Sequence, residues 1–210
     1  MLRKLVSRAL VVAGALPALA GAANAHHLMG GETPSSFVEG LLSGLGHPVI
    51  GPDHLAAVVA VGCLAALHGA GALLVVGYVT SMMVGVAFHL QGGTLPGAEI
   101  LVALSVLALG AALVRREAIG RAAALALFVV TGLLHGYAFG ESIFGAEPTP
   151  VFAYLAGLAG VQTALALAVM AGARAMFGAG GREPAAARLV GAAVFGIGLA
   201  VLMGQLVPAA

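Results

Sequence analysis

Apolar residues occur along this chain in long blocks that are separated by short polar stretches. Six such blocks follow residue 36, at residues 37–67, 71–91, 96–114, 122–140, 151–173 and 189–207. An α-helix needs about 20 predominantly apolar residues to cross the hydrocarbon core of a bilayer. The pattern therefore predicts an all-α membrane protein with six transmembrane helices, and it leaves no room for a separate soluble domain.

The first block, at residues 37–67, is too long for one straight span. As a single helix it would extend about 46 Å at ~1.5 Å per residue, whereas the hydrocarbon core is only ~30 Å thick. The segment HPVIGPDH at residues 47–54 explains the excess, because its two prolines and its glycine interrupt a helix. We expect residues 47–53 to be non-helical, with a half-helix before them. A second helix would then begin near Pro52, since proline is favoured in the first turn of a helix.

The composition excludes a soluble protein. The chain is 61% hydrophobic and only 8% charged, whereas soluble domains carry roughly 25% charged residues. The net charge is +1 and the basic residues are few, so no nucleic-acid partner is expected. The single cysteine, Cys63, cannot form a disulfide within the chain. The chain has no GxxxxGK[ST] phosphate loop, so it carries no ATPase motif of its own.

Residues 1–25 have the features of a secretory signal peptide. A basic start is followed by the apolar run of residues 9–19 and by an A-x-A pattern at residues 23–25. An uncleaved first span is the alternative, although the run is short for one. Cleavage would expose His26 and His27 at the mature N-terminus, where amine, amide and imidazole nitrogens suit Ni²⁺ or Cu²⁺. The alternative for this pair is a solvated terminus.

The arginines indicate the orientation of the spans. All basic residues beyond the signal peptide are arginines at or after the third and fifth blocks: Arg115, Arg116, Arg121, Arg174, Arg182 and Arg188. These two loops share a side if the spans alternate, and short loops rich in arginine stay in the cytoplasm. We therefore expect a multi-pass protein of the inner (cytoplasmic) membrane, with its mature N-terminus periplasmic or extracellular.

Two intramembrane histidines are expected at the same depth. His54 lies 13 residues from the inner end of the first block, and His135 lies 13 residues from the inner start of the fourth. Each is then ~20 Å from the cytoplasmic face at ~1.5 Å per residue. Ionisable side chains inside a membrane usually mark a functional site, and imidazole with carboxylate suits a divalent transition metal. We interpret His47, Asp53 and His54, together with His135, as a metal site.

Two further residues are candidate metal ligands near the outer surface. Glu141 follows His135 by six residues, which does not place the two on one face of a regular helix. They would converge only if an intervening glycine relaxes the helix. His89 lies near the outer end of the second block, where it would line an entrance.

Several of these residues also have an interpretation without metal. Asp53 could be a helix N-cap, His135 a donor between helices, and Glu141 a solvated loop carboxylate. In the fifth block, Gln162 and Thr163 are expected to form hydrogen bonds to neighbouring helices.

The two histidine segments resemble those of a known family. HPVIGPDH is similar to the HPxxGxDH motif of the HupE/UreJ family, and HGYAFGE at residues 135–141 is similar to its later HGxAHGxE motif. The resemblance covers nearly the whole mature chain and implies uptake of nickel or cobalt. It implies that the metal pathway contains His47, Asp53, His54, His135 and Glu141. Phe139 stands where the later motif has a second histidine, which removes one nitrogen ligand; the pair His26 and His27 is a candidate replacement.

We expect a secondary transporter or facilitator that imports Ni²⁺ or Co²⁺ as its substrate and that is not an enzyme. The implied partners are the metal ion and the lipid bilayer, with homo-oligomerisation open and no organic cofactor expected. One alternative is a membrane-embedded metalloenzyme, although the chain lacks the HExxH helix of zinc peptidases. Another is a haem-binding electron-transfer subunit with paired histidines as axial ligands. Nickel and cobalt favour the same ligand types, so both remain candidates.

Overall fold

The computed structural model of the chain describes residues 33–115, 119–177 and 184–207. These residues form seven helices and no strand: α2 (Phe37–Ile50), α3 (Pro52–Ala66), α4 (Gly71–Leu90), α5 (Ala98–Val114), α6 (Arg121–Glu141), α7 (Pro148–Phe177) and α8 (Pro184–Leu206). The expected all-α class is confirmed, and the apolar blocks match the helices to within a few residues at most ends. The proposed signal peptide, with His26 and His27 after it, lies outside the described residues.

The described helices are those of a multi-pass membrane protein. Four of them, α4, α6, α7 and α8, are long and apolar enough to cross a bilayer, and the bent pair α2–α3 counts as a fifth if it forms one span. The sixth expected span corresponds to α5, which has 17 residues. At ~1.5 Å per residue this helix is about 26 Å long, slightly less than the hydrocarbon core.

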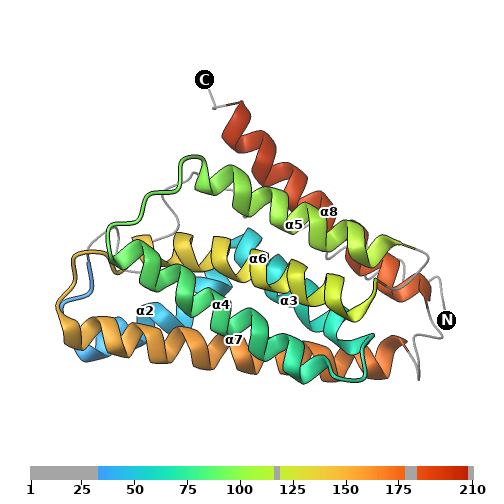
Figure 1. Cartoon of the computed structure of the whole chain (residues 1–210), viewed down its shortest axis with the longest axis horizontal. Coiled ribbons are helices and arrows are strands. Elements are labelled where there is room, and N and C mark those ends of the chain that lie inside the picture. Colours follow the sequence, from blue (N-terminus) through green and yellow to red (C-terminus); the bar gives the residue numbers. More distant parts are fainter. Residues whose placement is uncertain (1–32, 116–118, 178–183, 208–210) are drawn as a thin grey trace.

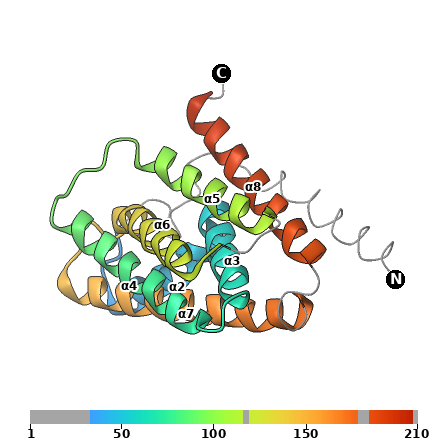
Figure 2. The ribbon, with the colours of Figure 1, turned by 45° about the vertical axis from the view of Figure 1, so that its right-hand side comes forward.

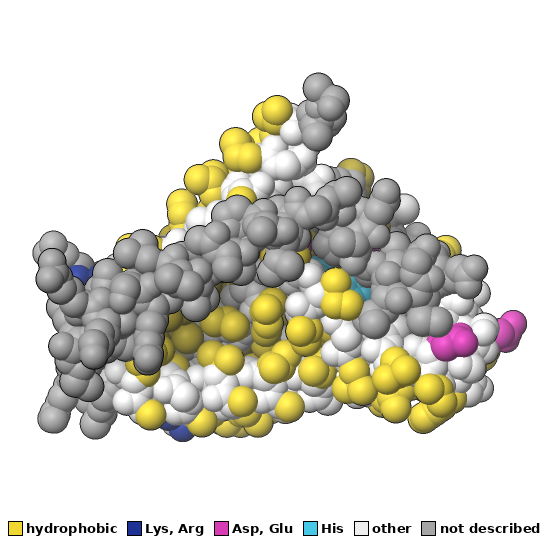
Figure 3. Space-filling model, turned by 180° about the vertical axis from the view of Figure 1, so that it is seen from behind, with side chains coloured by type: hydrophobic (Ala, Val, Ile, Leu, Met, Phe, Trp, Pro, Cys, Tyr) yellow, Lys and Arg dark blue, Asp and Glu magenta, His cyan; other side chains and the backbone are white. Residues whose placement is uncertain are grey.

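The helices are arranged in pairs around α3. In both ribbon views α7 runs along α2 and α3, α4 lies beside α6, and α5 lies beside α8 (Figures 1 and 2). The side chains of α3 form the centre of the larger hydrophobic cluster, with Ala57, Val58, Ala60 and Val61 fully enclosed. Figure 3 shows apolar side chains spread over the outer surface, acidic side chains at one end and basic side chains near the other. This separation agrees with spans that alternate in direction.

The bend between α2 and α3 is at Gly51. The two helices meet at an angle of 78°, and Gly51 has an extended backbone (φ −74°, ψ 116°). Pro52 begins α3 as expected. The expectation that residues 47–53 are all non-helical is wrong, because α2 continues through Pro48 to Ile50. A proline inside a helix removes one hydrogen bond and kinks the helix, and here the chain leaves the helical conformation only between the two prolines.

Glycines bring α4 and α6 into backbone contact. Gly132, Gly136 and Gly140 follow one another at intervals of four on α6, as in the small-residue interfaces of membrane helices. A Cβ atom on Gly136 would collide with the carbonyl oxygen of Met82 on α4. His135 is adjacent in sequence, so this close contact also limits where the backbone of His135 can lie.

We predict that Gly136→Ala destabilises the protein by about 1–3 kcal/mol, because the added methyl group overpacks a rigid backbone contact. Gly160→Ala is the matched control, since a Cβ at this position on α7 meets no atom within 4 Å. The control should leave stability unchanged or raise it by about 0.4–1 kcal/mol. Thermal unfolding of both purified variants in detergent would measure the difference, and equal midpoints would contradict the packing argument.

Candidate metal site

Three imidazoles from different parts of the chain meet inside the protein. His47 lies near the end of α2, His54 in the first turn of α3 and His135 on α6, with 5%, 4% and 0% of their surfaces exposed. The His54 ring lies 5.6 Å from that of His47 and 5.0 Å from that of His135, measured between centroids. We call these residues the histidine cluster. The expected common depth of His54 and His135 is confirmed by their direct contact.

A chain of hydrogen bonds determines which ring nitrogens carry protons. Nδ1 of His54 lies 2.8 Å from Nδ1 of His135, whose Nε2 lies 3.1 Å from the hydroxyl of Ser105 on α5. Ser105 donates its only proton to the carbonyl of Val102 at 2.7 Å, so it accepts from His135 Nε2–H. Nδ1 of His135 then accepts from Nδ1–H of His54. In this arrangement the neutral ring of His54 carries its proton on Nδ1.

The break at Gly51 places Asp53 beside His54. The carboxylate of Asp53 is buried and accepts the backbone N–H of His54 at 2.9 Å. A Cβ on Gly51 would lie only 2.7 Å from Cδ2 of His54 and 3.1 Å from Oδ1 of Asp53. Gly51 is the N-cap of α3, so Asp53 is not the cap itself. At this point the absence of a side chain allows an imidazole and a carboxylate to lie against the backbone.

Residues at the end of α6 contact His47 and fix its position. Its Nδ1 lies 2.8 Å from the hydroxyl of the buried Ser142, just beyond the end of that helix. The ring of Phe139 closes the same side, at 5.1 Å from His47 and 4.2 Å from His54 between centroids. The two parts of the broken helix are therefore both joined to α6 through their histidines.

The histidine cluster is closed in this conformation. Among the described residues, no three His, Cys, Asp or Glu side chains are arranged to hold one metal ion. Each nitrogen ligand lies ~2.0–2.1 Å from a metal such as zinc, so two ligands of one tetrahedral ion are about 3.3 Å apart. The 2.8 Å between the Nδ1 atoms of His54 and His135 is shorter than this ligand–ligand distance. Two imidazoles that bind a haem iron from opposite sides must lie even farther apart. An ion that binds both Nδ1 atoms must first separate the two rings.

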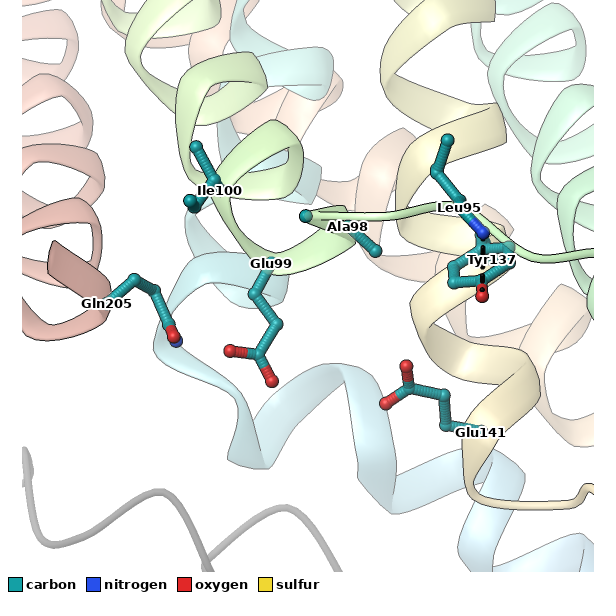
Figure 4. Close-up of a pocket in the computed structure, with 8 residues that line it drawn as sticks. Leu95, Ala98, Glu99, Ile100, Tyr137, Glu141 and Gln205 are labelled. Carbon is teal, nitrogen blue, oxygen red and sulfur yellow. Dashed lines mark hydrogen bonds between the residues drawn. The ribbon is translucent and has the colours of Figure 1, made fainter.

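Glu141 lies apart from the histidine cluster. Helix α6 is unbroken up to Glu141, which is exposed and lines an open cavity of about 350 Å³ together with Glu99, Tyr137 and Gln205. Figure 4 shows both carboxylates directed into the same space between the ends of α5 and α6. The ring of His89 packs against that of Tyr137, with 4.5 Å between their centroids. The geometry thus separates the sequence candidates into a buried group and an outer group.

His68 lies in the turn between α3 and α4, at the opposite end from Glu141. Its Nδ1 is 2.9 Å from the carbonyl oxygen of Leu64, and its Nε2 is 3.1 Å from that of Ile119. Its two ring nitrogens thus lie within hydrogen-bonding distance of carbonyl oxygens from two backbone segments, of which a neutral ring can donate to one.

The sequence interpretation did not include Ser105 and Ser142. Both are buried serines that bond to members of the histidine cluster. Serine is common in membrane helices, where it usually bonds to a carbonyl of its own helix, so its sequence position alone gave no signal. A usable signal is that Ser105 lies in the middle of the third apolar block, far from either end.

We predict that Ser105→Ala removes the hydrogen bond that keeps the proton of His135 on Nε2. With no acceptor at Nε2, both neutral forms of the ring become accessible, and ¹⁵N NMR of histidine-labelled protein should show a mixture where the natural protein shows one form. The loss of one hydrogen bond should reduce stability by only about 1 kcal/mol. Ser105→Thr keeps a hydroxyl that can bond the carbonyl one turn earlier, so it should restore the single form. An unchanged spectrum in Ser105→Ala would contradict this account.

Comparison with known proteins agrees with these features. The HupE / UreJ protein family matches residues 14–201. Protein HupE of Rhizobium leguminosarum bv. viciae is 33% identical over 170 residues, which cover 79% of this chain and 86% of that protein. No solved structure matches the chain. The match extends through both histidine segments and all described helices except the end of α8, and the chain belongs to the HupE/UreJ family.

Proposed function

We propose that this protein imports Ni²⁺ or Co²⁺ as a secondary transporter or facilitator, with the histidine cluster and Asp53 as its central binding station. The observation that carries the proposal is the meeting of three buried imidazoles from a broken helix and α6 within an apolar helical protein. Intramembrane ionisable groups are costly and usually serve transport or catalysis. Broken helices are typical of transporter binding sites.

The charges suggest the direction of the path. With six alternating spans, the arginine loops lie in the cytoplasm and the cavity with Glu99 and Glu141 opens to the outside. The two carboxylates would attract a hydrated cation to this opening, and His89 lies behind Tyr137 at its edge. His26 and His27, exposed after removal of the signal peptide, would add nitrogen ligands for capture at the same surface.

The central step exchanges a hydrogen bond for metal ligation. The ion loses water at the histidine cluster, where imidazole nitrogens and the carboxylate of Asp53 replace it. Because a bare divalent ion is strongly disfavoured in an apolar environment, the negative charge of Asp53 is needed beside the neutral rings. An ion that binds Nδ1 of His135 replaces the hydrogen bond that this atom accepts from His54. The closed conformation is therefore the ion-free one in this scheme.

We predict that His54→Ala abolishes most uptake of radiolabelled Ni²⁺ in cells, since the residue contacts both other members of the histidine cluster. A loss of tenfold or more corresponds to about 1.4 kcal/mol on the transport barrier. His68→Gln is the control, because His68 lies in the turn between α3 and α4, outside the histidine cluster, and contacts backbone carbonyls. Uptake is normalised to the amount of protein in the membrane. Equal uptake in the two variants would remove His54 from the mechanism.

We predict that Phe139→His tightens metal binding. Its ring lies beside both His47 and His54, so an imidazole in its place adds a nitrogen ligand to the histidine cluster. The dissociation constant for Ni²⁺, measured by titration of purified protein, should fall by about tenfold, equivalent to ~1.4 kcal/mol. Phe139→Leu serves as the control for altered packing. Equal affinity in the histidine and leucine variants would show that the ion does not bind here.

A further inference from the structure

Three buried polar side chains below the histidine cluster have no hydrogen-bond partner among the described residues. They are the hydroxyls of Tyr78 and Thr131 and both polar atoms of the Gln162 amide. All three residues have 0% of their surface exposed. Buried polar groups are nearly always paired, and an unpaired group costs free energy because it has lost its bonds to water. Three in one region of one small protein require an explanation.

Other hydroxyls in the helices do have partners. Ser81 donates to the carbonyl of Tyr78, Tyr154 donates to that of Phe139, and Thr163 donates to that of Ala159 on its own helix. The expectation that Thr163 bonds between helices is therefore wrong. The same expectation for its neighbour Gln162 is wrong among the described residues, which provide it with no partner. Two further unpaired buried atoms, Nδ1 of His89 and Nε of Arg188, belong to ionisable side chains; among the described buried hydroxyls, those of Tyr78 and Thr131 are the exceptions.

Their positions along the helices place them in one layer. Tyr78 on α4 precedes Met82 by one turn, and Gln162 on α7 follows Leu158 by one turn. Met82 and Leu158 belong to the same hydrophobic cluster, and residues four apart share a helix face. Tyr78 and Gln162 therefore face the same interior region between α4 and α7.

Thr131 reaches this layer from α6. It precedes His135 by one turn, on the same helix face. These four residues correspond to ~6 Å along the helix axis at ~1.5 Å per residue. The layer thus lies about one turn from the histidine cluster, on the side of the arginine loops.

The chemistry of the layer differs from that of the histidine cluster. It offers two hydroxyls and one carboxamide, which are neutral oxygen and nitrogen groups without imidazole or carboxylate. Neutral oxygens bind a divalent transition metal more weakly than imidazole does, but they hydrogen-bond well to the water molecules around it. A path through a membrane needs sites that are weak enough for the ion to leave.

We propose that Tyr78, Thr131 and Gln162 form a second binding station, at which the divalent cation regains water after it leaves the histidine cluster. This inference rests on the proposed transport function and adds the exit side of the path. The station accounts for the unpaired groups, because their partners are the ion and its water during transport.

The test uses three replacements of nearly equal shape, Tyr78→Phe, Thr131→Val and Gln162→Leu, in the full-length protein. Each removes the unpaired polar atoms and leaves the apolar packing. Uptake of radiolabelled Ni²⁺ is measured over a range of concentrations in cells, and thermal unfolding is measured in detergent. For Gln162→Leu we expect the maximal rate to fall about fivefold, equivalent to ~1 kcal/mol on the barrier. The half-saturating concentration should change by less than about twofold, because capture occurs elsewhere.

The stability of Gln162→Leu should not fall together with its maximal uptake rate. Removal of an unpaired buried amide should leave the unfolding midpoint of Gln162→Leu unchanged or raise it. Thr163→Val is the matched control, because this hydroxyl is adjacent in sequence and already bonds within its helix; its uptake should be unchanged.

Two results would overturn the proposal. An unchanged maximal rate in all three variants would show that the ion does not use these groups. A lower maximal rate accompanied by a lower unfolding midpoint would show that the groups stabilise the fold, for example through buried water. His54→Ala in the same series separates this question from the function itself. If His54→Ala is inactive while Gln162→Leu is fully active, only the second station is lost; if both are fully active, the proposed function fails as well.

Discussion

The structure depends on the need of buried polar groups for partners inside the protein. Lipid offers no hydrogen bonds, so the imidazoles of the histidine cluster are satisfied by other parts of the chain. His54 bonds to His135, His135 to Ser105, and His47 to Ser142. These contacts connect the broken helix to α6, and α6 to α5. The same bonds that make the histidines tolerable in an apolar protein also bring them together.

The break at Gly51 orients the side chains at the start of α3, whereas the close helix contacts position whole helices. The break turns the start of α3 inward, so that His54 and Asp53 project from a helix end and not from a helix side. The contact of Gly136 with the backbone of α4 sets how deeply α6 can approach. Small residues at membrane-helix interfaces allow such approach. The backbone packing of α6 against α4 thus limits where His135 can lie, and its hydrogen bond with His54 then selects one proton arrangement.

Much of this arrangement could be predicted from the sequence, and the remainder depends on tertiary contacts. Apolar blocks of spanning length set the helices, and residue counting placed His54 and His135 at one depth because both lie on helices of regular rise. The extent of the break was overestimated, since a proline such as Pro48 can remain inside a kinked helix. Counting along the chain also gave no information on rotation about the helix axis. For that reason the partners Ser105 and Ser142, and the unpaired state of Gln162, could not be foreseen.

The depth of the imidazoles also bears on how an ion can pass. At the outer cavity, Glu99 and Glu141 are exposed, so their attraction for a cation acts through water and is weakened by salt. At the histidine cluster the surroundings are apolar, and there a single carboxylate such as Asp53 interacts far more strongly with a nearby charge. A site of that kind holds an ion well but releases it slowly. Under the proposed function, the polar layer one turn beyond would address this difficulty, because its neutral hydroxyl and amide groups carry no second fixed negative charge that would retain the departing ion.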